Sequence, residues 1–377
     1  MEIYLDNSAT TCPYDEVIDV VSGSMKTLYA NPSSLHKKGK EAEDKVNAAR
    51  KFIASKINAK EDELFFTSGG TESNNIAILG AARKNKRNGN KIITTRVEHP
   101  SVLECFKQLS NEGFECVYVD VDENGIVNVN QIESEIDCNT VLVSVMAVNN
   151  ETGGIMPIEK IGKIIKEKNP SCLFHTDCVQ AFGKINIDTE KSKIDFLSVS
   201  AHKIGGPNGV GALYIRKKTN IISPSYGGGQ EKGIRSGTVN VSGILGFEKA
   251  CEITFSKSTN HKQIKEYFLN EILKLGNISV NSPKESVDNI LNVSFVGVKS
   301  EVLLHVLESK GIYVSSGSAC SSHKKEAGYV LSSMGRKPNE QDSAIRFSFG
   351  PDLTKEDIDY VLGVLNKEIP ILRKIMR

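Results

Sequence analysis

The chain has 377 residues and a net charge of +1, with 39% hydrophobic and 25% charged residues. This balance is typical of a globular protein with a real core, and it argues against a general nucleic-acid binder, which usually carries a basic excess. No apolar stretch is long enough to span a bilayer, and the N-terminus lacks the pattern of a secretory signal.

The first two-thirds of the chain alternate between strand and helix patterns. Apolar side chains recur at helical spacing over 41–57. Strands are then expected over 63–68, 91–95, 114–121, 140–148, 172–177 and 194–200, with one more after the glycine-rich turn that begins at Ile204. Helices are expected over 72–84, 101–113 and 158–169. Such alternation predicts an α/β fold with a largely parallel sheet covered by helices on both faces.

The pattern changes after about residue 255. Helices are expected over 261–276 and 300–311, and strands over 289–297, 312–316 and 343–350. We expect Ser300 to cap the helix over 300–311, Gly311 to end it and Thr354 to cap a final helix. The sequence therefore predicts a large domain over 15–255 and a smaller α+β domain formed by 1–14 and 256–377.

Eight cysteines occur, and none forms a Cys-x-x-Cys pair, so neither a zinc ribbon nor a thioredoxin-like motif is indicated. A chain of this length does not need disulfides, so we expect reduced thiols and a cytoplasmic protein. Most of these cysteines are expected to be small core residues. Cys320 differs because it lies among serines and glycines in 315–325. The sequence leaves two interpretations of it open, a reactive thiol and a small residue tolerated in a loop.

Polar side chains follow several of the predicted strands. These groups are Gly70-Thr71, His99, Asn150, Asp177 with Gln180, and His202-Lys203. Each one alone is more often a capping turn, a satisfied histidine or a solvated lysine. Ligands of open α/β sheets bind beyond the carboxyl ends of the strands, however, so we expect these side chains to meet in one site.

Pyridoxal phosphate is the cofactor that suits this set of side chains. A lysine amine can bind its aldehyde covalently, a carboxylate can keep its ring nitrogen protonated, and a flat side chain can stack on the ring. The turn at Gly70, at the start of a predicted helix, suits a phosphate. No spacing of residues suggests a metal site.

Several motifs support the same conclusion by resemblance. The stretches "YLDNSATT", "FTSGGTESNN", "EHPSV", "HTDCVQA", "SAHKIGGPNGVGALY", "RSGT", "SSGSACSS" and "IRFSFG" occur in this order. Together they resemble the NifS-like cysteine desulfurases, within the aminotransferase class V family of pyridoxal phosphate enzymes. The resemblance implies the fold type I architecture of these enzymes.

The resemblance implies roles for individual residues. Lys203 would attach the cofactor, His99 would stack on its ring and carry protons, and Asp177 would pair with the ring nitrogen. The remaining cofactor contacts would come from Gln180 to the ring oxygen, from Gly70, Thr71, Ser200 and His202 to the phosphate, from Asn150, and from Thr238 to the phosphate of a neighbouring subunit, which implies a homodimer. Asn150 and Arg346 would hold the substrate.

The pattern around Arg346 supports its assignment, because Ile345 and Phe347 alternate with it along a strand, so the arginine should leave the apolar face. Its planar fork suits a carboxylate. A surface salt bridge is the alternative interpretation.

The implied reaction converts L-cysteine to L-alanine and leaves the sulfur on Cys320 as a persulfide, for delivery to an iron–sulfur scaffold or a tRNA-thiolation enzyme. The run His323-Lys324-Lys325 departs from the family pattern and leaves the identity of this acceptor open. Two other functions are kept as alternatives, a selenocysteine lyase or another class V lyase on the same site, and a non-catalytic scaffold for sulfur assembly.

Overall fold

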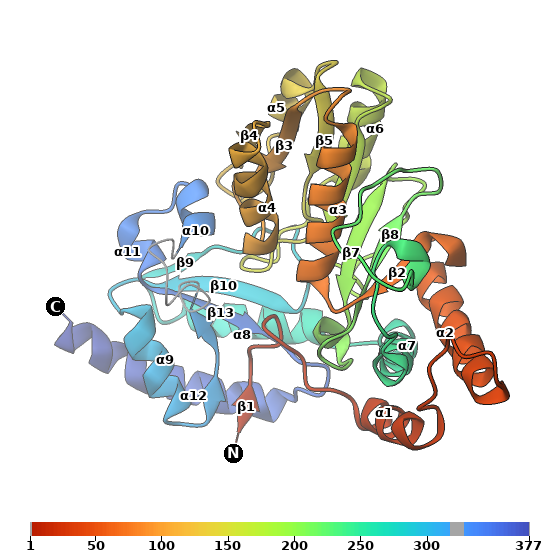
Figure 1. Ribbon diagram of the computed structural model, residues 1–377. Helices are drawn as coiled ribbons and strands as arrows, with labels where there is room; N and C mark the ends of the chain where they lie inside the picture. Colours follow the sequence, from red (N-terminus) through yellow and green to blue (C-terminus); the bar gives the residue numbers. More distant parts are fainter. Residues whose placement is uncertain (1, 317–327, 377) are drawn as a thin grey trace.

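The computed structural model describes residues 2–316 and 328–376. Its largest sheet has seven strands in the order β2-β8-β7-β6-β5-β3-β4 (Figure 1). The strands are β2 (Leu64–Thr67), β3 (Lys91–Thr95), β4 (Glu115–Val119), β5 (Thr140–Ser144), β6 (Leu173–Asp177), β7 (Phe196–Ser200) and β8 (Gly211–Ile215). Strands β3 to β7 pair in parallel, and β8 pairs antiparallel with both β7 and β2. The prediction of a largely parallel sheet is confirmed.

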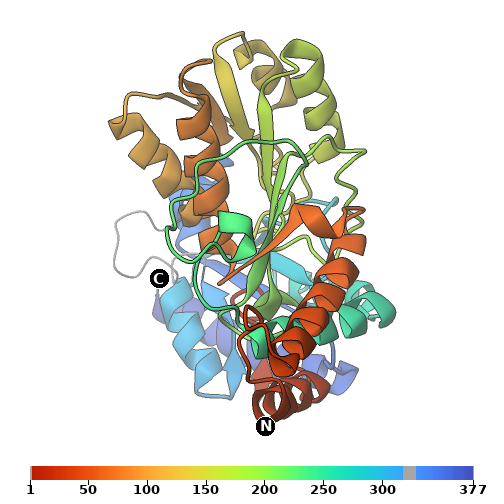
Figure 2. The same cartoon turned by 45° about the vertical axis from the view of Figure 1, so that its right-hand side comes forward.

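Helices cover both faces of this sheet, because neighbouring strand residues point to opposite sides. Ile92 packs in one cluster with α3 (Gly70–Asn85) and α4 (Pro100–Asn111). Ile93 belongs to another cluster, which contains the helices α2 (Lys37–Ser55), α6 (Ile158–Lys168) and α7 (Val241–Ser256). In Figure 2 the orange-brown α3 and α4 lie to the left of the strands and the olive-green α6 lies to their right. The helices α1 (Asp15–Thr27) and α5 (Val129–Glu135) complete this part.

A second sheet has four antiparallel strands in the order β12-β13-β10-β9. They are β9 (Ile278–Val280), β10 (Ile290–Phe295), β12 (Ser315–Ser316) and β13 (Ala344–Ser348). The helices of this part are α8 (His261–Leu273), α9 (Ser300–Glu308), α10 (Tyr329–Ser333), α11 (Pro338–Gln341) and α12 (Lys355–Ile375). The N-terminal strand β1 (Ile3–Tyr4) pairs in parallel with β11 (Ile312–Tyr313), so the start of the chain lies beside the C-terminal part of the fold (Figure 1).

Two of the three predicted helix ends are confirmed. Gly311 follows α9 with a left-handed φ of 74°, and the Thr354 side chain accepts a hydrogen bond from the Asp357 backbone at the start of α12. The prediction for Ser300 is wrong, because Ser300 is already the first residue of α9 and Lys299 is the capping residue. The single strand expected over 312–316 is two short strands, since β11 pairs with β1 and β12 pairs with β13.

The alternation along β13 is confirmed. Ile345 and Phe347 lie in the core between the second sheet and its helices, where the Phe347 ring meets the Phe268 ring at a centroid distance of 4.9 Å. Arg346 points to the opposite face, toward the large sheet.

We propose that 15–255 and the combination of 1–14 with 256–377 form two domains. The support is that Leu5 and the apolar residues of α8, α9, β13 and α12 share one cluster. No helix in the described part of the chain is long and apolar enough to cross a membrane.

Candidate active site

A cavity of about 340 Å³ lies at the carboxyl ends of the parallel strands and reaches across to β13. Residues from both sheets and from the N-terminal segment form its wall. The lining residues are Ser8, Ala9, Gly70, Thr71, Asn74, His99, Ser101, Met146, Val148, Asn150, Asp177, Val179, Gln180, Ser200, His202, Lys203 and Arg346. All of the side chains expected beyond the strand ends of the large sheet therefore meet in one place.

Lys203 lies in a short 3₁₀ helix, η2 (Ala201–Ile204), that directly follows β7. Gly205 ends this turn with a left-handed φ of 74°, a conformation that glycine adopts without strain. The Lys203 amine donates hydrogen bonds to the backbone carbonyls of Ser8 and Ala9, the latter at 2.7 Å. The N-terminal segment thus orients the lysine amine at the cavity wall.

Asp177 is the last residue of β6, and only 6% of it is exposed. Its Oδ2 accepts a hydrogen bond from Asn74 Nδ2 at 2.7 Å, and its Oδ1 accepts one from the backbone N–H of Val179 at 2.9 Å. Both oxygens therefore have fixed positions, and this carboxylate can serve as a partner for a cationic nitrogen.

His99 precedes α4, and its Nδ1 accepts a hydrogen bond from the backbone N–H of Ser101 at 3.2 Å. The His99 side chain is exposed and lines the cavity. The surrounding protein keeps part of the solvent away and so lowers the pKa of His99, while Asp177 raises this pKa and Lys203 lowers it. A neutral, flat ring therefore lies along one wall.

The N-terminus of α3 is a site for an anion. Gly70 and Thr71 are its first residues, so their backbone N–H groups are free of helical partners and lie at the positive end of the helix dipole. A Cβ on Gly70 would lie 2.6 Å from Val179 Cγ2, so only glycine fits there without displacement. His202 stands nearby, and burial lowers its pKa to about 4, which leaves it neutral.

Gln180 is oriented by Lys184, a half-buried lysine. Its Oε1 accepts a hydrogen bond from Lys184 Nζ at 2.8 Å, and its Nε2 donates to the Ser8 carbonyl at 2.9 Å. Burial lowers the pKa of Lys184 to about 7, with smaller contributions from the charges of Lys203 and Arg346. The amide nitrogen of Gln180 therefore faces Ser8, another residue of the cavity wall.

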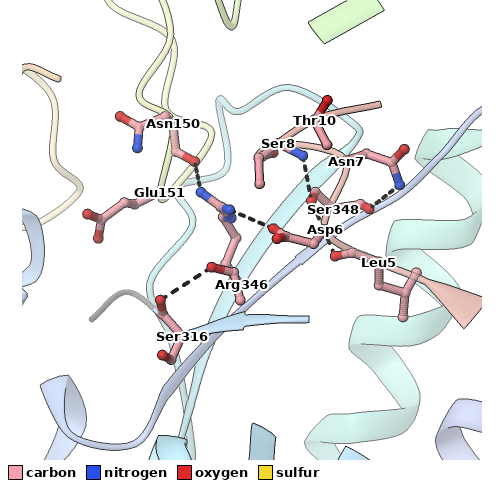
Figure 3. A network of polar contacts seen from close by, with 12 residues as sticks. Leu5, Asp6, Asn7, Ser8, Thr10, Asn150, Glu151, Ser316, Arg346 and Ser348 are labelled. Atoms are coloured by element: carbon pink, nitrogen blue, oxygen red, sulfur yellow. Dashed lines mark hydrogen bonds and ion pairs between the residues drawn. The ribbon is translucent and has the colours of Figure 1, made fainter. Parts of the chain in front are cut away.

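Arg346 lies on β13 and lines the cavity. Figure 3 shows its side chain directed toward Asp6 and Asn150. Its Nη2 donates to Asp6 Oδ1 at 2.7 Å and its Nη1 donates to the Asn150 carbonyl at 3.0 Å. Its Nε is buried and has no hydrogen-bond partner among the described residues. The guanidinium is thus held in place and retains donors for an anionic group.

The residues of this cavity fit pyridoxal phosphate. Four buried polar atoms in its wall have no hydrogen-bond partner within the described ranges, namely Ser8 Oγ, Asn74 Oδ1, Asn150 Oδ1 and Arg346 Nε. Buried polar groups are rarely left unpaired, so a polar occupant is indicated. An amine, a carboxylate, a flat ring and an anion-binding helix end then surround one space large enough for a small ligand.

Two predicted site residues are not in this cavity. Thr238 lies on an exposed stretch before α7, so its contact with a neighbouring subunit stays a prediction. Cys320 lies outside the described residues. None of the seven described cysteines lines the cavity, and burial raises the pKa of both Cys105 and Cys172 to about 12, which makes those two thiols poor nucleophiles.

Several lining residues were not predicted. Asn74 is four residues beyond Gly70 on α3, so helical spacing could have placed both on one face. Met146 and Val148 are two residues apart beyond the end of β5, so the alternation of side chains along an extended segment could have placed both on one face. Ser8 has no such signal, because its position depends on pairing between residues more than 300 positions apart.

His175 on β6, two residues before Asp177, gives a testable pH dependence. It is fully buried, its ring nitrogens contact Ser144 Oγ at 2.8 Å and Ser198 Oγ at 3.2 Å, and burial lowers its pKa to about 3. In the unfolded chain, His175 binds a proton below about pH 6.5. In the folded chain, the same imidazole binds a proton only at about pH 3. The stabilisation from neutral His175 is therefore complete above about pH 6.5 and is lost as the pH falls.

We expect His175→Gln to reduce the loss of unfolding free energy on acidification by about 1.4 kcal/mol per pH unit. Urea unfolding between about pH 6 and pH 4 measures this slope. Asn111→Gln, which replaces an exposed side chain without a titratable group, is the control and should leave the slope unchanged. Equal slopes in the wild type and the His175 variant would contradict the assignment.

Comparison with known proteins places these features in a family. The aminotransferase class-V family model matches residues 3–361. The cysteine desulfurase IscS of Clostridium botulinum (strain Hall) is 41% identical over 382 residues, which cover 99% of this chain and 96% of that protein. A solved structure of a NifS-like protein superposes with a TM-score of 0.93 at 38% identity and covers 99% of this chain and 100% of its own. A structure of SspA in complex with cysteine has a TM-score of 0.84 at 33% identity, with 93% of this chain and 99% of its own covered.

Proposed function

The chain belongs to the aminotransferase class-V family and is a cysteine desulfurase of that family, and from this premise we propose how its own residues perform the reaction. The proposed cofactor is pyridoxal phosphate, the proposed substrate is L-cysteine, and the proposed product on the enzyme is a persulfide at Cys320. The observation that carries the proposal is that Lys203, Asp177, His99 and Arg346 line one cavity.

The cofactor would be held by groups on three sides of the cavity. Lys203 would bind its aldehyde carbon, and Asp177 would pair with its ring nitrogen, because both oxygens of that carboxylate are already oriented. The neutral His99 ring would lie against the cofactor ring. The phosphate would be bound by the residues at and near the start of α3, which are Gly70, Thr71, Ser200 and His202. Once bound, pyridoxal phosphate supplies an electron sink for the substrate carbon atoms.

The substrate would be oriented by Arg346 and Asn150. Asp6 and the Asn150 carbonyl fix the guanidinium, so the remaining N–H groups of Arg346 are directed at the substrate carboxylate. The amide of Asn150 has a buried Oδ1 that lacks a partner among the described residues, and it would contact the cofactor or the substrate. The amine of Lys203 and the imidazole of His99 are the candidate proton carriers.

The thiolate of Cys320 would attack the sulfur of L-cysteine. A sulfur–sulfur bond forms, the carbon–sulfur bond breaks, and its electron pair stays with carbon, which takes up a proton to become the methyl group of L-alanine. L-cysteine and one thiol thus give L-alanine and one persulfide. The terminal sulfur would then pass to an acceptor protein.

The proposed protein is a homodimer. In it, Thr238 of one subunit would contact the phosphate site of the other.

Purified protein supplied with L-cysteine and a thiol reductant tests this proposal. Equal amounts of L-alanine and sulfide are expected, and addition of L-selenocysteine in a parallel sample separates a desulfurase from a selenocysteine lyase. A protein that consumes neither amino acid would leave the scaffold alternative as the better account.

Replacement of Arg346 should mainly weaken substrate binding. We expect Arg346→Ala to raise KM for L-cysteine on the order of 10-fold to 100-fold, because a hydrogen bond to a charged group contributes about 1.5–3 kcal/mol. Steady-state kinetics measures the change. Arg96→Ala removes a solvent-exposed arginine of the same protein and should leave KM unaltered. An unchanged KM in Arg346→Ala would place the carboxylate anchor elsewhere.

A further inference from the structure

One wall of the cavity carries a continuous line of hydrogen bonds from Asp177 to His99. Asn74 Nδ2 lies 2.7 Å from Asp177 Oδ2 and 2.9 Å from Ser101 Oγ. Ser101 Oγ lies 2.8 Å from His99 Nδ1. The four residues come from β6, α3 and the start of α4, so three separate elements build this line.

The chemistry of the partners fixes the direction of each hydrogen bond. The two oxygens of Asp177 both accept hydrogen bonds, from Asn74 and from the Val179 backbone. The nitrogen of the Asn74 amide must therefore face Asp177, and it has two hydrogens. One hydrogen goes to Asp177, and the second points to the Ser101 hydroxyl oxygen, which accepts it.

The Ser101 hydroxyl consequently has its own hydrogen left for His99. The backbone N–H of Ser101 also points at the same His99 nitrogen, at 3.2 Å. Two donors directed at Nδ1 require a lone pair on that nitrogen, so the ring proton must be on Nε2. Among the described residues, Nε2 takes part in no hydrogen bond, which leaves it for the occupant of the cavity.

We propose that Ser101 and Asn74 are positioning residues that hold His99 as a neutral imidazole with its proton on Nε2. Asp177 sets the direction of the hydrogen bonds in this line of four residues, which we call the relay. The inference rests on the proposed function for its consequence. His99 would present a hydrogen-bond donor to the cofactor and substrate. It could take up a second proton only at Nδ1, where two donors oppose it, so the Lys203 amine is the better proton acceptor.

A simpler interpretation is that His99 only caps α4. The cap needs the backbone N–H of Ser101 but not the Ser101 hydroxyl. Replacement of the hydroxyl therefore distinguishes a relay from a cap. The charged groups that face His99 are Asp177 on β6 and Lys203 on η2, and both remain in such a variant.

The tautomer of His99 can be measured by NMR on protein with ¹⁵N-labelled histidine. The chain has seven histidines, and a His99→Gln variant assigns the signal. In the wild type we expect a proton on Nε2 and a nonprotonated Nδ1. In Ser101→Ala we expect the pKa of His99 to rise by roughly half a unit to one unit, because the neutral form loses one hydrogen bond.

Two further variants make the result specific. Ser101→Thr keeps a hydroxyl and should restore the wild-type signal. Ser110→Ala removes an exposed serine of the same helix and should change nothing. In turnover, the acidic limb of the pH profile of kcat should move upward in Ser101→Ala by the same amount as the pKa of His99.

A proton on Nδ1 in the wild type would overturn the inference, as would a Ser101→Ala spectrum identical to that of Ser110→Ala. The measurement is independent of the reaction. Protein with the expected tautomer that fails to consume L-cysteine would contradict the proposed function and leave the relay intact. Active protein with the His99 proton on Nδ1 would contradict the relay and leave the proposed function intact.

Discussion

Lys203→Ala is expected to abolish turnover of L-cysteine, with a loss of at least about three orders of magnitude in kcat. The amine of Lys203 is held at the cavity wall by two backbone carbonyls of the N-terminal segment, and alanine has no group that can bind an aldehyde. The variant should also lack the near-visible absorption band of the covalently bound cofactor.

Lys203→Arg is the matched variant, because it keeps the positive charge but cannot form the covalent link. It should resemble Lys203→Ala. Lys217→Ala, which removes an exposed lysine, should keep both the band and the activity. Reduction of the wild type with borohydride should mark Lys203 in a peptide map. An unchanged band in Lys203→Ala would refute Lys203 as the cofactor lysine.

Cys320→Ala is expected to release no sulfide from L-cysteine, while it keeps the cofactor band. The reaction needs a thiolate to take the sulfur, and an ordinary thiol with a pKa of roughly 8.5 supplies a small thiolate fraction at neutral pH. None of the described cysteines lines the cavity, so no second thiol among the described residues is placed to take the sulfur. Sulfide and L-alanine assays measure the loss.

Cys12→Ser and Cys138→Ser are the controls for Cys320, because both of these thiols are exposed. Each should keep normal turnover and a normal cofactor band. Sulfide release at the wild-type rate from Cys320→Ala would rule out a persulfide on this residue. L-alanine without a protein persulfide would favour a lyase that needs no catalytic thiol.

The strand ends of the large sheet could be predicted because buried parallel strands are continuous apolar runs with polar residues directly after them. Asp177 and Lys203 were found in this way, and both line the cavity. A strand was expected after the glycine-rich turn, but the orientation of β8 in the sheet could not be predicted. An apolar run such as Gly211–Ile215 does not reveal whether the strand pairs parallel or antiparallel with its neighbours.

Helices α1 and α7 were missed for a physical reason. The buried residues of α7 include Ile244, Leu245 and Phe247, which occupy more than one side of the helix, so no single apolar stripe marks it. The α1 helix has only two buried residues, Val17 and Ser24. Helices with all-round or scarce burial carry a weak periodic signal in the sequence.

The site was predicted only in part because many of its contacts join residues that are far apart in the sequence. The alternation in β13 revealed that Arg346 leaves the apolar face, and this prediction is confirmed. Its partner Asp6 could not be found from spacing, since it is 340 residues away in the sequence. The hydrogen bonds from Asp177 to His99 could not be predicted from the sequence either, because they join side chains of three separate elements.

The central claim is that sulfur moves from L-cysteine to Cys320. The most direct measurement is a mass spectrum of the intact protein after exposure to L-cysteine without reductant, followed by peptide mapping. The account predicts a gain of the mass of one sulfur atom on the peptide that contains Cys320, together with an equal amount of L-alanine. Formation of L-alanine with no added sulfur on that peptide, or with the sulfur on another cysteine, would contradict it.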